Sequence, residues 1–144
     1  MVQRILVWAH TLLIFGSAFY LGIADWNSMH WPALLRWAAG VSLILVGHVV
    51  VWTGVTQIGM AATSDDATGL RTEGLYRYSC NPQYVADVLI LLGWSVLNAS
   101  ILALPVTALG IVFLLVAPFA EEPWLAEKYG RDYSVYRTKV PRYL

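Results

Sequence analysis

Residues 88–120 read VLILLGWSVLNASILALPVTALGIVFLLVAPFA, and this charge-free stretch decides the fold. As one helix it would be roughly 50 Å long at about 1.5 Å per residue, well beyond a hydrocarbon core of about 30 Å. It must therefore be broken, and the short polar turn at 97–100 favours a break there, with Pro105 tolerated near the start of the next helix. The stretch predicts a tight pair of antiparallel helices over about 83–97 and 101–120.

Two further charge-free intervals, 5–24 and 37–64, precede this pair. Hydrophobic residues make up 58% of the chain and charged residues 12%, whereas an ordinary soluble domain is about 25% charged. Each interval is long enough for a helix that crosses a bilayer. We therefore expect an all-α integral membrane protein, a single membrane domain over residues 1–144, with four transmembrane helices at about 5–24, 36–58, 83–97 and 101–120.

Positive charge is distributed unevenly over the two sides of this arrangement. With four spans, the N-terminus, the 59–82 connection and the C-terminal tail lie on one side of the membrane. Of the nine Lys and Arg residues, only Arg36 falls on the other side. The positive-inside rule therefore predicts that both termini are cytoplasmic.

The second predicted helix carries glycine every seven residues, at Gly40, Gly47 and Gly54. This spacing places the three glycines on one stripe, where another helix can approach closely. Near the first connection, three tryptophans are typical of interfacial anchors: Trp26, Trp31 and Trp37. Asp65, Asp66 and Thr68 mark a loop after the second helix.

The end of the chain, residues 121–144, is amphipathic. After Pro123, apolar and aromatic residues recur at spacings of three or four, with charged residues between them: Trp124, Leu125, Tyr129, Tyr133, Tyr136 and Val140. The pattern predicts a C-terminal amphipathic helix on the cytoplasmic face of the membrane. We expect it to lie against residues 71–84, RTEGLYRYSCNPQY.

Acidic residues lie at the cytoplasmic ends of the predicted hairpin. Because its helices are antiparallel, Asp87 at the start of one helix and Glu121 and Glu122 at the end of the other meet at the same surface, where ionisable groups are usually partnered. They can surround one pocket together with the aromatic loop. Alternatively, the glutamates mark the membrane boundary and Asp87 pairs with Arg77 or Arg142.

The loop before this hairpin combines a helix start with aromatic rings. The Asn81-Pro82 step begins a helix, whose free backbone N–H groups favour an anionic group. The neighbouring rings of Tyr76, Tyr78 and Tyr84 have faces that favour a cation. The stretch therefore suits a ligand that carries both charges, although interfacial tyrosines alone would show the same composition.

Other kinds of site find no support in the sequence. The single cysteine, Cys80, excludes an internal disulfide, and His10 and His48 lie in separate spans without a cysteine or acidic partner, so we expect packing roles and no metal site. No phosphate-cradling glycine loop and no nucleophile elbow is present. We expect no nucleic-acid partner.

Two sequence elements carry a resemblance to a known family. EGLYRYSCNPQY (73–84) resembles the G-x-Y-R-Y-x-R-H-P-x-Y element of the isoprenylcysteine carboxyl methyltransferase and phospholipid methyltransferase superfamily. The ending EEPWLAEKYGRDYSVYRTKVPRYL (121–144) resembles that superfamily's E-E-x-x-L-x-x-x-F-G-x-x-Y-x-x-Y-x-x-x-V-P-R. The two elements stand in the family's order on either side of a helical hairpin, so the resemblance covers about residues 72–143.

This resemblance implies a membrane methyltransferase that uses S-adenosylmethionine and a lipophilic small-molecule or membrane-embedded acceptor, with a cytoplasmic active site. Carried over by position, it implies catalytic roles for Glu121, Glu122 and Arg137. The cofactor-binding residues that it implies are Tyr76, Asn81, Pro82, Gln83 and Tyr84 in the first element and Glu121, Glu122, Tyr133 and Tyr136 in the second. Tyr133, Tyr136 and Arg137 would form a lid.

The sequence departs from the family pattern at two places. Cys80-Asn81 replaces the usual Arg-His, and an amide can hydrogen-bond but never carries charge. The arginine often found a turn before the paired glutamates is missing, since residues 116–118 are Val, Ala and Pro. The acceptor thus stays open among a prenylated cysteine, an amino-lipid headgroup, a quinone-like ring and a small hydrophobic thiol or acid.

Two other functions fit parts of the sequence. NPQYVAD (81–87) shares its proline, tyrosine and aspartate with the H-P-N-Y-x-G-D element of NADPH-dependent membrane sterol reductases. A family member without the histidine and the arginine could also be a non-catalytic membrane scaffold or binding protein. The oligomeric state is not predicted.

Overall fold

The computed structural model describes the backbone of residues 2–58 and 69–144, and the side chains of residues 9–56 and 69–144. Within these residues all regular structure is helical, as predicted. The elements are α1 (Val2–Ala24), α2 (Ala33–Ile58), the short 3-10 helix η1 (Gly74–Arg77), α4 (Pro82–Asn98) and α5 (Ala103–Lys139). The loop predicted at Asp65, Asp66 and Thr68 lies outside the described residues.

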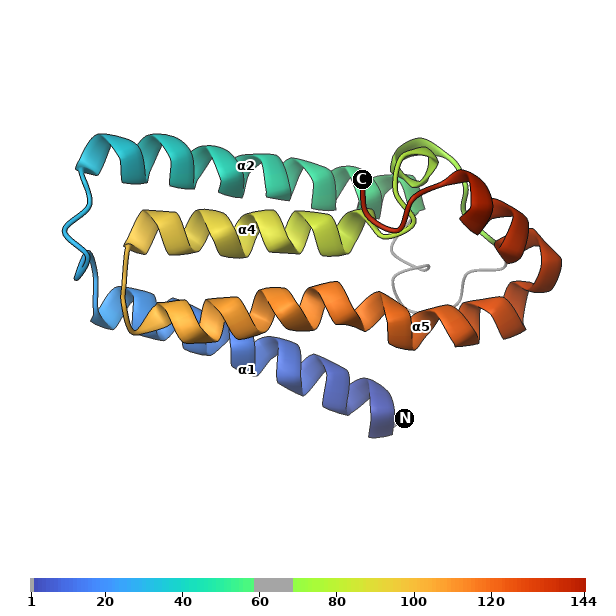
Figure 1. Ribbon diagram of the computed structural model, residues 1–144, viewed down its shortest axis with the longest axis horizontal. Helices are drawn as coiled ribbons and strands as arrows, with labels where there is room; N and C mark the ends of the chain where they lie inside the picture. Colours follow the sequence, from blue (N-terminus) through green and yellow to red (C-terminus); the bar gives the residue numbers. More distant parts are fainter. Residues whose placement is uncertain (1, 59–68) are drawn as a thin grey trace.

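The four α-helices lie side by side and run alternately up and down (Figure 1). α4 packs most extensively against α2 and also against α5, whereas α1 packs mainly against α5. A small apolar core of Ala18, Leu91 and Leu114 forms where α1, α4 and α5 meet. This order brings the start of α4 and the far part of α5 to the same end of the bundle.

Glycine allows α2 and α4 to approach closely. A Cβ atom built on Gly93 would lie 2.7 Å from the Gly40 carbonyl oxygen, and one on Gly47 would lie 2.8 Å from the Ala86 oxygen. The predicted glycine stripe is thus confirmed at Gly40 and Gly47. At Gly54 the nearest atoms are 3.9 Å or more away, so the helices have begun to separate there.

The hairpin turn lies where the sequence places it. α4 ends at Asn98, and Ala99 adopts the left-handed conformation with φ 45°. The Asn98 side-chain oxygen accepts a hydrogen bond from the Ser100 N–H at 2.9 Å. Asp25, from the α1–α2 connection, accepts hydrogen bonds from the Ser100 hydroxyl at 2.7 Å and the Leu102 N–H at 3.1 Å, which ties this turn to the end of α1.

Arg36 fixes the same end of the bundle. Its side chain is buried, and its Nε donates a hydrogen bond to the Leu97 carbonyl oxygen at 2.9 Å. This oxygen lies in the last turn of α4, where carbonyl groups have no donor within the helix. The Arg36 guanidinium carbon also lies 4.7 Å from the centre of the Trp26 ring. The one cation predicted for this side of the membrane therefore has a structural role.

The last helix extends beyond its predicted end at residue 120. α5 continues through Pro118 and Pro123 to Lys139, and its one non-helical residue is Gly130, with φ 53° and ψ −126°. Glycine reaches this conformation without a Cβ clash. The chain turns back at Gly130, and the final segment returns toward the start of α4 (Figure 1). The predicted amphipathic segment is therefore helical but begins as a continuation of α5.

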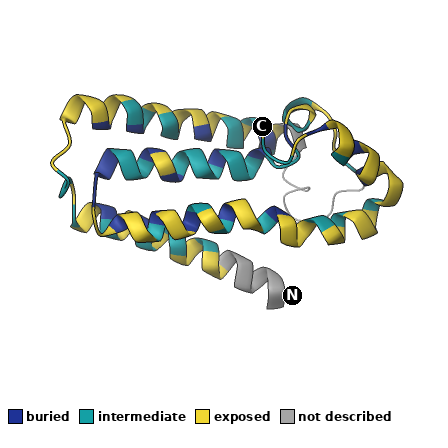
Figure 2. Cartoon of the chain, viewed as in Figure 1, coloured by how far each residue is buried: buried dark blue, intermediate teal, exposed yellow. Residues whose placement is uncertain are grey.

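The outer surface of the bundle is largely apolar. Among the described residues, two helices are long and apolar enough to cross a membrane: Ala33–Thr56 with a mean hydropathy of 1.9 and Ala103–Lys139 with 2.3 in its most apolar window. Exposed and half-buried residues cover the outside of both (Figure 2), including Leu34 at 82% exposure and Trp52 at 63%. Such surfaces belong in a lipid environment.

Candidate functional site

The predicted site residues come from three segments that meet at one end of the bundle. These are the loop that includes η1, the first turn of α4, and the chain after residue 118. The tail docks on the loop through the Cys80 N–H, which donates to the Pro141 oxygen at 2.9 Å, and the Tyr136 hydroxyl, which donates to the Tyr76 oxygen at 2.7 Å. The predicted contact between the tail and residues 71–84 is confirmed.

An aromatic cluster holds this end together. Tyr133, Tyr136 and Val140 are buried in its centre, and half-buried Leu70, Tyr76, Cys80, Leu125 and Tyr129 surround them. Burial raises the pKa of the Tyr76 hydroxyl and of the Cys80 thiol above their ordinary values. Tyr78, in contrast, is 68% exposed. Both tyrosines assigned to a lid are thus the core of this cluster.

Tyr84 and Glu121 join the start of α4 to α5. The Tyr84 hydroxyl donates to Glu121 Oε1 at 2.5 Å, a short hydrogen bond to a carboxylate. The Tyr84 ring is half-buried against the apolar core of the bundle, whereas Glu121 is exposed. The two sequence elements therefore do meet, as their antiparallel helices predict.

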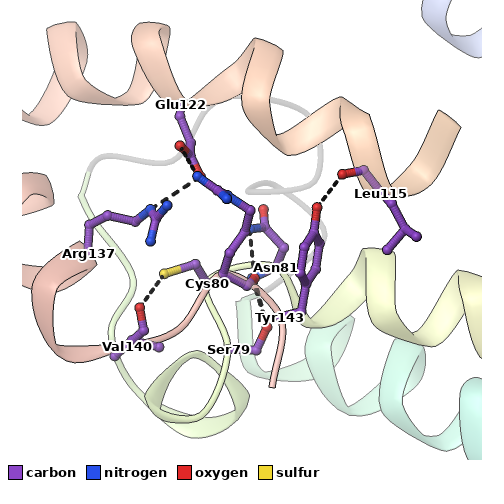
Figure 3. A network of polar contacts seen from close by, with 9 residues as sticks. Ser79, Cys80, Asn81, Leu115, Glu122, Arg137, Val140 and Tyr143 are labelled. Carbon is purple, nitrogen blue, oxygen red and sulfur yellow. Dashed lines mark hydrogen bonds and ion pairs between the residues drawn. The ribbon is translucent and has the colours of Figure 1, made fainter. Parts of the chain in front are cut away.

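Glu122 forms ion pairs with two arginines, Arg137 and Arg142. Its carboxylate accepts hydrogen bonds from Arg142 Nε at 2.5 Å and Nη2 at 2.9 Å, and from Arg137 Nε at 3.2 Å. The Arg142 guanidinium carbon also lies 3.8 Å from the centre of the Phe119 ring, a cation–π contact. Figure 3 shows Glu122 and Arg137, which follows the break at Gly130, turned toward each other.

Asn81 contacts the end of the chain. Its backbone N–H donates to Ser79 Oγ at 3.0 Å, and its side-chain Nδ2 donates to the Arg142 carbonyl oxygen at 3.0 Å (Figure 3). Pro82 follows as the first residue of α4 and is buried, which confirms the predicted helix start, and Gln83 is half-buried behind it. The amide thus holds the tail in place on the loop.

Two open grooves flank residues 131–144, which follow the break at Gly130 and which we call the folded-back segment. The smaller, about 330 Å³, is lined by Glu122, Tyr133 and Arg137 together with Phe119 and Ser134. The larger, about 710 Å³, includes Tyr136 among its lining residues. Other predicted site residues line neither groove: Tyr76, Asn81, Pro82, Gln83, Tyr84 and Glu121. Asp87, expected at the same pocket, also lines neither.

Two residues of this site, Ser79 and Tyr143, were not singled out from the sequence, and Arg142 was considered only as a partner for Asp87, whereas its ion pair is with Glu122. Arg142 binds Glu122, Ser79 accepts from Asn81, and the Tyr143 hydroxyl donates to the Leu115 oxygen. The V-P-R of the second element contains Arg142, so the pattern held a signal for it. Among the described residues, no group of three or more metal-ligating side chains occurs. His48 is exposed on α2, and its Nδ1 lies 2.9 Å from the Ile44 oxygen of the same helix.

Comparison with known families identifies the chain. The family model described as phospholipid methyltransferase matches residues 35–132, more than half of the chain. The matched range contains α2 from its third residue, all of η1 and α4, and both glutamates. No curated protein and no solved structure matches the chain. The chain belongs to the phospholipid methyltransferase family, which indicates a membrane methyltransferase.

Proposed function

We propose that the chain is an S-adenosylmethionine-dependent methyltransferase that acts on a lipophilic or membrane-embedded acceptor. Family membership supports methyl transfer. The observation that carries the cofactor assignment is the contact between Tyr84 and the exposed Glu121, at the meeting point of the two sequence elements. S-adenosylmethionine carries a sulfonium, an ammonium and a carboxylate, so it requires carboxylates, aromatic faces and hydrogen-bond donors together.

The two glutamates take different roles in this proposal. Glu122 is already neutralised by Arg137 and Arg142, so it positions the tail and is a poor partner for a further cation. Glu121 accepts from one neutral hydroxyl, and no cation pairs with it among the described side chains. We therefore assign the cationic groups of the cofactor to Glu121, beside the Tyr84 ring.

The smaller groove supplies a positively charged side chain and an aromatic ring, Arg137 and Tyr133. Its volume of about 330 Å³ lies within the range of about 300–1,000 Å³ that small-molecule sites occupy. Arg137 lines it and uses Nε for Glu122, while no hydrogen bond from its terminal nitrogens occurs within the described part of the chain. These nitrogens suit a carboxylate or ribose hydroxyl, and the buried Tyr133 supplies an aromatic wall. The residues present therefore fit the cofactor.

When bound, the cofactor supplies an electrophilic methyl group. The chain's contribution is to align the reactants and to exclude water, since an in-line displacement depends mainly on these. The buried tyrosines and the bond from Asn81 to the tail keep the folded-back segment over this end of the bundle. If the acceptor is a carboxylate, no general base is needed, and Glu121 and Arg137 then act as binding groups.

The acceptor would reach the site from the bilayer. The apolar outer faces of α2 and α5 indicate contact with lipid, and a lipophilic acceptor can approach laterally between helices. We propose that all four long helices cross the membrane, with α1 and α4 beside the two most apolar ones. With this arrangement, the distribution of Lys and Arg supports a cytoplasmic position for both termini and the site.

Cofactor binding by the purified full-length protein tests this proposal. Calorimetry should detect binding of S-adenosylmethionine and of its demethylated product, and Glu121→Gln should weaken it about tenfold, the loss expected for one charged contact. Glu127→Gln is the matched control, because Glu127 is an exposed carboxylate farther along α5 that lines neither groove. Well-folded protein that binds neither compound would refute the assignment.

Two further measurements separate the competing functions. A thermal shift by NADPH in place of S-adenosylmethionine would favour the reductase. Cofactor binding without transfer of a labelled methyl group to any lipid or small-molecule extract would favour the non-catalytic binding protein. Identification of a labelled product would name the acceptor.

A further inference from the structure

The larger groove is lined by three cations from two distant parts of the chain. Arg77 ends η1, whereas Arg131 and Lys139 lie in the α5 segment that returns after Gly130. They surround an open groove of about 710 Å³, with Asp132 as the one carboxylate among its lining residues. We call it the basic groove.

These cations differ from the arginines beside Glu122. Arg137 and Arg142 each form an ion pair. Arg77, Arg131 and Lys139 are exposed, and within the described side chains none of them forms one. Like charges repel one another, so three cations around one groove destabilise the fold. An anion bound in the groove offsets this repulsion and stabilises the fold.

Part of the lining of the basic groove is apolar. Buried Val140 and Tyr136 and half-buried Leu70 line it, and all three belong to the aromatic cluster. A ligand that fits both features carries an anionic head and an apolar portion. Arg77, Arg131 and Lys139 are among the cations that the positive-inside rule assigns to the cytoplasmic surface of the membrane, where anionic lipids are enriched.

We propose that the basic groove binds a phosphate group, presented by the headgroup of an anionic membrane phospholipid. Arginine forks and the lysine ammonium are the side chains that recognise phosphate oxygens. The site is separate from the proposed cofactor contacts at Glu121 and Tyr84, and does not depend on methyl transfer. Its occupation would hold the folded-back segment on the membrane surface.

Ligand binding to the full-length protein in neutral detergent micelles tests this site. The probes are phosphatidylglycerol and, as the soluble arm, glycerol phosphate, with affinity measured by microscale thermophoresis. Lys139→Gln should raise the dissociation constant for phosphatidylglycerol about tenfold, as should Arg131→Gln, and added salt should weaken binding in the wild type. Circular dichroism and the melting temperature establish that each variant is folded.

Lys128→Gln is the matched control. Lys128 lies on the same helix but outside the basic groove, where its ammonium is 4.6 Å from the centre of the Trp124 ring. It should bind phosphatidylglycerol within about twofold of the wild type. Equal losses in Lys128→Gln and Lys139→Gln, or no binding of either phosphate probe to the wild type, would overturn the proposal.

The two arms identify the source of the phosphate. Much tighter binding of phosphatidylglycerol than of glycerol phosphate supports a lipid headgroup. Equal affinity, lost in Lys139→Gln, supports the phosphate site with a soluble ligand. S-adenosylmethionine binding measured on the same samples should not change in Lys139→Gln, so failure of the groove and failure of the cofactor assignment are distinguishable.

Discussion

Arg142 binds the carboxylate of Glu122 through two hydrogen bonds, with Nε 2.5 Å from Oε1 and Nη2 2.9 Å from Oε2. The carbonyl oxygen of the same Arg142 accepts from the Asn81 side chain. Arg142, which lies beyond the end of the last helix, therefore joins α5 to the loop before α4. The geometry of the site depends on this residue, although neither sequence element assigns it a role in catalysis.

Removal of the Arg142–Glu122 contact should loosen the tail. About a fifth of each side chain is exposed, so the ion pair is partly screened by water, and we expect a coupling of about 1 kcal/mol. The measurement is a double-mutant cycle of Arg142→Gln and Glu122→Gln, with stability taken from thermal unfolding. Strictly additive losses would show that the pair contributes no stability.

Close packing of α2 on α4 gives a second prediction. In Gly93→Ala the new Cβ would lie 2.7 Å from the Gly40 carbonyl oxygen, which belongs to backbone and cannot move independently. We expect a loss of about 1–3 kcal/mol in stability, typical of overpacking. Gly16→Ala is the control, because no atom lies within 4 Å of its added Cβ. Similar melting temperatures for the two variants would contradict the close approach.

Acid should weaken the turn at the other end of the bundle. Hydrogen bonds from Ser100, Leu102 and Ser28 lower the pKa of Asp25 below its ordinary value. A depressed pKa in the folded state means that Asp25 stabilises the fold above its unfolded pKa of about 3.9, and that this stabilisation disappears as the pH falls through the folded value.

The check is thermal unfolding between pH 7 and pH 3. The wild type should lose more stability over this range than Asp25→Asn, whereas Asp132→Asn, at an exposed carboxylate on α5, should follow the wild type. Parallel curves for the wild type and Asp25→Asn would rule out a stabilising ionised Asp25.

The sequence predicted the helices and their ends where local chemistry decides them. The polar turn at 97–100, Pro82 as the first residue of α4, and close packing at Gly40 and Gly47 follow from residue type and spacing alone. The meeting of Glu121 with the start of α4 follows from the antiparallel hairpin. The turn and the helix start depend on a short segment, whereas the close packing and the Glu121 contact need only the pairing of neighbouring helices.

The path of the tail could not be predicted in the same way. The end of the charge-free stretch suggested that the helix ends near residue 120, yet the helix continues through Pro118 and Pro123, and the reversal falls at Gly130. Likewise, the sequence alone gave the two glutamates equal weight. Arg142 contacts Glu122 because the chain reverses at Gly130 between them. The two residues are twenty positions apart, so no local pattern in the sequence predicts this contact.

Cys80 provides a probe of the docked tail. Its thiol is half-buried in the aromatic cluster and lies 3.4 Å from the Val140 oxygen, to which it can donate. Burial raises the pKa of the thiol, so less of the reactive thiolate is present at a given pH. We expect slow alkylation by iodoacetamide at pH 8, at least tenfold slower than for an ordinary thiol of pKa about 8.5, and a rate that still rises with pH where the rate of the ordinary thiol has levelled off.

Denatured protein sets the reference rate, since it exposes the same single cysteine. Arg142→Gln should accelerate alkylation of the folded protein, because Arg142 ties the segment that covers Cys80 to Glu122. Lys128→Gln should leave the rate unchanged. A folded protein that reacts at the denatured rate at pH 8 would mean that the tail does not cover the loop, and the assignment of Tyr133 and Arg137 to a common site would fail with it.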